Sequence, residues 1–209
     1  MPIDLAGLAP AGRTAVLTME LQRGVVGDLA PMPALARAVA DRSVVANTAR
    51  LLRAARSGGA RVVHCLAGFR ADHAGSSFAA PMLARALARG GLSPIAGTPN
   101  AELVSELGPE PGDLLSTRVH GFSPFTATSL DVWLRNLGVT TVVATGVSLN
   151  LGIIGTCLEA VNLGYTVVVP TDAVCGIPKD YADAVLTNTI AAIAHLTTVE
   201  ALITAWTKS

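Results

Sequence analysis

The sequence predicts a three-layer α/β/α domain with a six-stranded parallel sheet, Rossmann-like in outline. Short β-branched runs alternate along the chain with longer stretches of helical periodicity that are rich in Ala, Leu and Arg. A helix between successive strands is the connection that parallel pairing requires. Hydrophobic residues make up 51% of the 209 residues and charged residues 14%. Much of the chain must therefore be buried in a layered core or in an oligomer interface.

The predicted strands are the β-branched runs, and the first of them reads TAVLTMEL. All six are short, as is usual for strands inside a parallel sheet. They cover residues 14–21, 60–66, 113–119, 139–145, 166–174 and 197–199.

The predicted helices follow apolar periodicity and their terminal residues. One long helix should end at Gly58-Gly59, another is capped by Ser129, and another is opened by Pro178. The helical ranges are 33–59, 81–91, 129–138, 150–165, 178–196 and 200–206.

Composition excludes several classes of function. Fifteen basic residues balance fifteen acidic ones, so no nucleic-acid partner is expected. No apolar run is long enough to span a membrane, and the N-terminus lacks a signal-peptide pattern. Cys65, Cys157 and Cys175 suggest neither disulfides nor a zinc site. We therefore expect one cytoplasmic domain over residues 1–209.

Three predicted strands end in groups that can do chemistry. The first ends with Glu20 and Gln22, and the third with Arg118, followed by His120. The fourth leads into GVSLN, just before a helix. Because parallel strands end at one edge of a sheet, an acid, a guanidinium and a helix N-terminus should meet in one pocket.

The stretch from Arg118 to Val174 carries a distinctive pattern. It reads RVHGFSPFTATSLDVWLRNLGVTTVVATGVSLN and then LGYTVVVPTDAV, while TMELQ ends the first strand. In these segments the chain resembles the isochorismatase-like family of cysteine hydrolases, and the resemblance covers residues 14–199. It implies the isochorismatase-like fold and a hydrolase activity.

The resemblance also implies a catalytic set that this sequence has changed. The family's usual members place an Asp, a Lys and a nucleophilic Cys where this chain has Glu20, Arg118 and Gly152. Only two lysines occur, Lys179 and Lys208, so none lies near the third strand to replace Arg118. The family's peptide before the residue matching Ser148 is often cis, which implies a binding role for Val147, Ser148 and Asn150.

No other cysteine is expected to replace the missing nucleophile. Cys157 lies five residues beyond Gly152, roughly 7.5 Å along the helix and about 140° around it. Its apolar neighbours indicate a buried thiol. Cys175 lies at the correct edge of the sheet but lacks a helix N-terminus or an adjacent base.

A hydrolase without the cysteine remains chemically reasonable. True isochorismatases also carry a small residue at this position and hydrolyse a vinyl ether without a covalent intermediate. Glu20 can be the general acid/base, Arg118 can clamp a substrate carboxylate, and His120 is the nearby group suited to base chemistry. The substrate site would be completed by Gln22, His120, Val147, Ser148, Asn150 and Gly152.

The alternative is a catalytically inactive homologue that binds a ligand or assembles with a partner protein. In that case Glu20 and Arg118 form a buried ion pair that preserves the fold. On both readings we expect a small, anionic ligand or substrate, no cofactor and a homo-oligomer. An open pocket beside Arg118 would favour the enzyme.

Other candidates favour structural roles. His64 lies inside the second strand and is interpreted as a satisfied core histidine. Asp72-His73 lacks the further ligands that a metal site needs. Asp172 is interpreted as a hydrogen-bond acceptor for neighbouring loops, and His195 as a residue that ends a helix.

Overall fold

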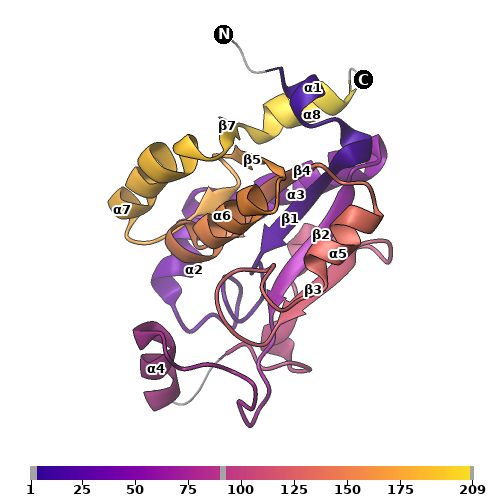
Figure 1. The fold of residues 1–209 in the computed structure, drawn as a ribbon. Helices are drawn as coiled ribbons and strands as arrows, with labels where there is room; N and C mark the ends of the chain where they lie inside the picture. Colours follow the sequence, from indigo (N-terminus) through magenta and orange to yellow (C-terminus); the bar gives the residue numbers. More distant parts are fainter. Residues whose placement is uncertain (1–3, 90–92, 208–209) are drawn as a thin grey trace.

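The computed structural model describes residues 4–89 and 93–207. It confirms the α/β class: a parallel sheet lies between two helical layers (Figure 1). The main path of the sheet has six strands in the order β3-β2-β1-β4-β5-β7, and β6 pairs with β4. Their bounds are β1 Thr14–Met19, β2 Arg61–Ala67, β3 Leu114–Arg118, β4 Thr141–Val147, β5 Thr166–Pro170, β6 Val174–Cys175 and β7 His195–Thr197.

The helices flank the sheet on both faces. One face packs against α2, α3 and α8, and the other against α5, α6 and α7. Their bounds are α1 Leu5–Leu8, α2 Pro33–Asp41, α3 Val44–Gly58, α4 Pro81–Ala88, α5 Leu130–Asn136, α6 Ile154–Asn162, α7 Lys179–Ala184 and α8 Val199–Thr207. Two π-helical segments, η4 Leu149–Ile153 and η5 Val185–Thr189, adjoin α6 and α7. Short 3-10 turns are η1 Ala11–Arg13, η2 Pro99–Ala101, η3 Ser105–Leu107 and η6 Ile190–Ala192.

The order of the strands locates the functional edge. The chain adds β2 and β3 on one side of β1, then returns to place β4 on its other side. This reversal is a topological switch point, where open parallel sheets form a crevice at the carboxyl ends of their strands. All six residues of β1 and all seven of β4 are buried, so the crevice stands on the most rigid part of the sheet.

The single long helix predicted over 33–59 is wrong. The structure divides it into α2 and α3, with Ser43 in the left-handed region at φ 53°. At 100° per residue, an unbroken helix would place Val44, Leu51 and Ala55 opposite Leu35. The break turns both apolar stripes toward one core, in which all four side chains are buried.

Smaller boundary predictions also change. The predicted fifth strand, 166–174, divides into β5 and β6 at a turn, and His195 begins β7 instead of ending a helix. Ser129 makes no side-chain cap; Thr128 Oγ1 instead accepts from the Leu130 N–H at 3.2 Å. The predicted helix end at Gly90-Gly91 and Lys208 lie outside the described residues.

Asp172 and His64 have the structural roles expected of them. Asp172 accepts a hydrogen bond from the Val199 N–H, 2.9 Å away, at the start of α8. His64 is fully buried and hydrogen-bonds with Thr18 at 2.8 Å and with Asp113 at 3.2 Å. Arg56 pairs with the same Asp113 carboxylate at 2.6 Å. The histidine is therefore satisfied by neighbours in the core.

β1 and β4 approach each other closely at Gly146, which pairs in register with Met19. A Cβ on Gly146 would lie 2.9 Å from Met19 N and 3.0 Å from Met19 C, and would overlap the Met19 oxygen. Gly146 also has φ 104°, a conformation that side chains disfavour. Glycine is therefore required at this position.

We expect Gly146→Ala to lower the free energy of unfolding by about 3 kcal/mol, because it adds a backbone clash to an unfavourable φ. Urea titration followed by circular dichroism measures the change. Gly112→Ala is the matched control, since a Cβ there meets nothing within 4 Å. Equal stability of the two variants would contradict the close approach of the strands.

The buried His64 predicts a pH dependence of stability. Burial lowers the pKa of His64 below its usual 6.5, although Asp113 opposes the shift. The unfolded chain then binds more protons than the folded one below about pH 6.5, so this contribution to stability is lost as the pH falls. We expect the free energy of unfolding to fall between about pH 6.5 and about pH 5.5, by at most 1.4 kcal/mol per pH unit for one proton.

His64→Gln should flatten this part of the profile, which urea titrations at both pH values would measure. His195→Gln is the control, because that side chain is exposed at the start of β7. A wild-type slope retained in His64→Gln would mean that another group causes it.

Candidate functional site

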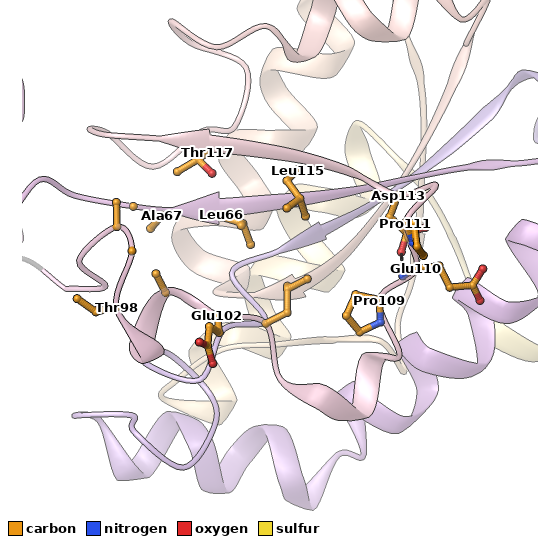
Figure 2. A pocket seen from close by; sticks show the side chains of 15 residues that line it. Leu66, Ala67, Thr98, Glu102, Pro109, Glu110, Pro111, Asp113, Leu115 and Thr117 are labelled. Carbon is orange, nitrogen blue, oxygen red and sulfur yellow. Dashed lines mark hydrogen bonds between the residues drawn. The ribbon is translucent and has the colours of Figure 1, made fainter.

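One cavity of the described residues, of about 760 Å³, lies beside β2 and the edge strand β3 (Figure 2). Its acidic side chains already have cationic partners. Glu102 pairs with Arg23 at 2.8 Å, and Glu110 and Asp113 pair with Arg56 at 3.3 Å and 2.6 Å. With every described acid there neutralised, this cavity offers little to a reacting substrate.

The second cavity, of about 640 Å³, lies where the sequence predicts a pocket. Its wall contains Glu20 after β1, Arg118 at the end of β3, and Ser148 after β4. The three ends of strands therefore converge as expected, at the switch point of the sheet. We call this space the strand-end cavity.

Glu20 occupies a strained backbone position. Its φ is 52°, in the left-handed region that costs a non-glycine residue roughly 1 kcal/mol or more. Its N–H donates to the Cys65 carbonyl at 3.0 Å, which fixes the backbone at the end of β1. The side chain keeps 19% of its surface exposed, so the carboxylate can meet both ligand and water.

Arg118 is the buried cation of the site, with 4% of its surface exposed. Nη2 pairs with the Glu20 carboxylate, and Nε donates to the Gly121 carbonyl at 3.2 Å. Nη1 is buried without a hydrogen-bond partner. An unsatisfied donor on a buried charge is costly, so Arg118 has unused capacity for an anion.

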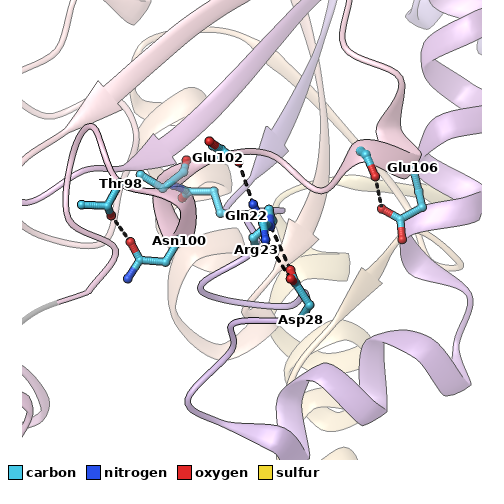
Figure 3. Close-up of polar contacts among 9 residues, drawn as sticks. Gln22, Arg23, Asp28, Thr98, Asn100, Glu102 and Glu106 are labelled. Atoms are coloured by element: carbon cyan, nitrogen blue, oxygen red, sulfur yellow. Dashed lines mark hydrogen bonds and ion pairs between the residues drawn. The ribbon is translucent and has the colours of Figure 1, made fainter.

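Gln22, predicted to bind substrate, is completely buried and does not line the strand-end cavity. Its amide donates to the Ala67 and Ala101 carbonyls at 2.8 and 2.9 Å and accepts from the Ala67 N–H at 2.9 Å. The next residue, Arg23, bridges Asp28 and Glu102, each at 2.8 Å (Figure 3). These contacts tie the loop after β1 to residues 100–104, so the structure gives Gln22 a positioning role.

The turn after β4 forms another wall of the cavity. The Val147–Ser148 peptide is cis, as the resemblance implies. Ser148 Oγ donates to Asn150 Oδ1 at 2.8 Å, and both residues line the cavity together with Gly152. Val147 is fully buried. Ser148 occupies the N-cap position of η4, although its side chain makes no capping bond.

Gly152 is buried in a space with no room for a side chain. A Cβ built on it would lie 2.9 Å from the Val147 carbonyl oxygen and 3.0 Å from Met19 Cε. Backbone atoms cannot move aside as a flexible side chain can, so the strand and turn are packed against the glycine. A side chain at Gly152, where the resemblance implies the nucleophilic Cys, would therefore require the turn to shift.

The three cysteines are buried and poorly suited to attack a substrate. Burial raises the pKa of Cys157 and that of Cys65 to about 12, the latter despite the nearby Arg118 charge. Burial also raises the pKa of Cys175. The thiolate is the reactive form, so these environments oppose nucleophilic catalysis.

Two other sequence candidates lie away from the strand-end cavity. His120 is half-buried beyond β3 and is not among the residues that line it. Asp72 forms a surface ion pair with Arg70 at 2.7 Å.

Sequence reasoning missed the walls supplied by α4 and by the loop before α2. Met82, Arg85 and Ala86 of α4 and its C-cap Arg89 line the cavity at helical spacing. Met32, from the loop before α2, is 51% exposed at the same cavity. The i, i+3, i+4, i+7 spacing in α4 was a usable signal, but nothing in it indicates which part of the sheet the helix faces.

Comparison with known proteins agrees with this geometry. The model of the isochorismatase domain matches residues 14–201. The chain is 36% identical over 86 residues to the uncharacterized isochorismatase family protein YwoC of Bacillus subtilis, covering 41% of this chain and 45% of that protein. It is 31% identical over 149 residues to the ureidoacrylate amidohydrolase RutB of Variovorax paradoxus, covering 63% and 56%. These matches thus span about half the length of the curated relatives.

A solved structure resembles the whole domain. An isochorismatase family protein from Desulfovibrio vulgaris superposes with a TM-score of 0.78 at 30% identity, covering 91% of this chain and 96% of that one. No described helix is both long and apolar enough to cross a bilayer. With its domain model matched over nearly the whole chain, the protein belongs to the isochorismatase family.

Proposed function

We propose that this protein hydrolyses a small carboxylated metabolite by general acid/base chemistry, without a cysteine nucleophile. The observation that carries the proposal is the strand-end cavity, where Glu20, Arg118 and Gly152 line one space of about 640 Å³. A cavity of this size admits a small molecule. It lies beside an acid that can transfer protons and a cation that cannot.

Arg118 would hold the substrate carboxylate. Nη2 already pairs with the Glu20 carboxylate, while Nη1 has no hydrogen-bond partner. The planar guanidinium can therefore bind the Glu20 carboxylate and a ligand carboxylate at the same time. The helical segment that starts at Leu149 begins beside the cavity, which Ser148, Asn150 and Gly152 line. A helix N-terminus favours negative charge, so this end would stabilise a developing oxyanion.

Glu20 would move the proton. For an amide or ureido substrate, it takes a proton from water as the water oxygen bonds to the carbonyl carbon. It then returns that proton to the leaving nitrogen as the carbon–nitrogen bond breaks, and it is unchanged at the end. The ureidoacrylate amidohydrolase relative supports carboxylated amides and ureido compounds as the first class to screen, followed by vinyl ethers such as isochorismate.

The second candidate is an inactive homologue that binds a ligand or assembles with a partner protein. The direct pairing of Glu20 with Arg118 favours this candidate, because a buried ion pair can persist as part of the fold. The open cavity beside the pair favours the enzyme. The homo-oligomer, the cytoplasmic location and the single domain over residues 1–209 stay predictions.

We expect Glu20→Gln to lower kcat by at least about 100-fold, because the amide keeps the shape of the acid but cannot transfer the proton. Screening amides, ureido acids and isochorismate with wild type identifies a substrate for this measurement. Glu106→Gln, at an exposed acid of η3, is the matched control and should keep wild-type turnover.

Circular dichroism should show the same fold in both variants. Full turnover by Glu20→Gln would contradict the acid/base assignment. Absence of turnover by wild type on all three classes would favour the inactive homologue.

We expect Gly152→Cys to create no cysteine hydrolase. Its Cβ meets the Val147 carbonyl and Met19, and such overpacking costs about 1–3 kcal/mol. Urea titration of Gly152→Ala isolates this cost. Gly155→Ala is the control in the same helix, where a Cβ has ordinary contacts of 3.6 Å or more, and it should be neutral or slightly stabilising.

A Gly152→Cys protein that is as stable as wild type and gains iodoacetamide-sensitive hydrolysis would contradict this prediction. It would mean that the turn still accommodates a thiol nucleophile.

A further inference from the structure

Among the charged residues that line the strand-end cavity, cations outnumber anions. Its wall contains one acid, Glu20, and three arginines: Arg118, Arg85 and Arg89. Glu20 is already paired with Arg118. The cavity therefore has an excess of positive charge, and that excess comes from α4.

Arg85 lies on the cavity-facing side of α4, and Arg89 is the C-cap of the same helix. Arg85 and Arg89 are one turn apart and line the cavity with Met82 and Ala86. Leu83, which is buried against Phe69 and Ala67, anchors the helix to the end of β2. Both guanidinium groups thus belong to a helix that is fixed beside the cavity by apolar packing.

Neither arginine is neutralised by the protein. No acidic residue occurs anywhere in residues 73–101, and no ion pair joins Arg85 or Arg89 to a residue of the described ranges, 4–89 and 93–207. Like charges one turn apart on a helix destabilise it slightly. A bound anion would remove that repulsion.

Much of the remaining lining is apolar. Phe69, Leu83, Phe122, Leu151 and Ile177 line the same space as the arginines. The cations come from different elements: Arg118 ends β3 and is buried, whereas Arg85 and Arg89 belong to the α4 segment and are exposed. An uncharged ligand body can pack on the apolar side chains while its carboxylates pair with different arginines.

We propose that the strand-end cavity selects a dicarboxylate, with one carboxylate on Arg118, the other on Arg85 and Arg89, and an apolar body between them. The inference rests on the proposed function for the role of Arg118 and adds α4 as the specificity-determining element. Arg85 and Arg89 would act on binding, and Glu20 on the chemical step.

Isothermal titration calorimetry with two unreactive probes of equal length, adipate and hexanoate, tests the proposal. We expect wild type to bind adipate at least about 10-fold more tightly than hexanoate, as two charge-assisted contacts predict. The preference should weaken as salt is added, because the distal arginines are exposed.

The double variant Arg85→Gln/Arg89→Gln should lose the preference and keep the wild-type affinity for hexanoate. Arg61→Gln is the matched control, since this exposed arginine begins β2 at the opposite edge of the sheet, and it should keep the preference. Equal binding of the two probes by wild type, no saturable binding of either, or a double variant that still prefers adipate would each overturn the proposal.

The same experiment separates this inference from the proposed function. Glu20→Gln should still prefer adipate, because Arg85 and Arg89 would bind the second carboxylate. A preference for adipate together with full turnover by Glu20→Gln would overturn the acid/base chemistry and leave the dicarboxylate site in place. Loss of turnover in Glu20→Gln, with no preference of wild type for adipate, would overturn the dicarboxylate site and leave the acid/base chemistry in place.

Discussion

The site depends on the close contact between β1 and β4. Gly146 lies against the Met19 backbone with no room for a Cβ, and the next residue on each strand begins a wall of the strand-end cavity. Glu20 follows Met19, and the turn from Val147 follows Gly146. The distance between the acid and the helix N-terminus is thus set by the backbones of two buried strands, which are stiffer than any pair of side chains.

That contact also leaves no room for a side chain at Gly152. Met19 extends from the same point of β1 and fills the space beside Gly152. The proposed chemistry therefore uses the charged residues of the cavity. In the proposed function an arginine binds and stabilises an anion, whereas proton transfer needs a carboxyl group. Arg118 and Glu20 would divide these two tasks.

Much of this arrangement could be predicted from the sequence, because it follows from periodicity and from where strands end. The β-branched runs gave the parallel sheet, and the edge shared by parallel strands brought Glu20 and Arg118 together. The break at Ser43 was predictable in principle, because Leu35 and Val44 fall on opposite faces of one continuous helix. Contacts between residues far apart in the sequence could not be predicted. Nothing local distinguishes a Gln22 that binds substrate from one whose amide is used by Ala67 and Ala101.

The attachment of α4 has a consequence for how such enzymes diversify. The helix stands apart from the layered body (Figure 1) and contributes a single fully packed residue, Leu83, to the small cluster that holds it. The charges to which we assign the chemistry, Glu20 and Arg118, lie instead at the ends of β1 and β3. Exchanging the segment from His73 to Ala101 between homologues should therefore transfer ligand preference without reconstructing the catalytic centre. In this architecture the segment that contains α4 would determine ligand preference, whereas the residues proposed for the chemistry stay with the sheet.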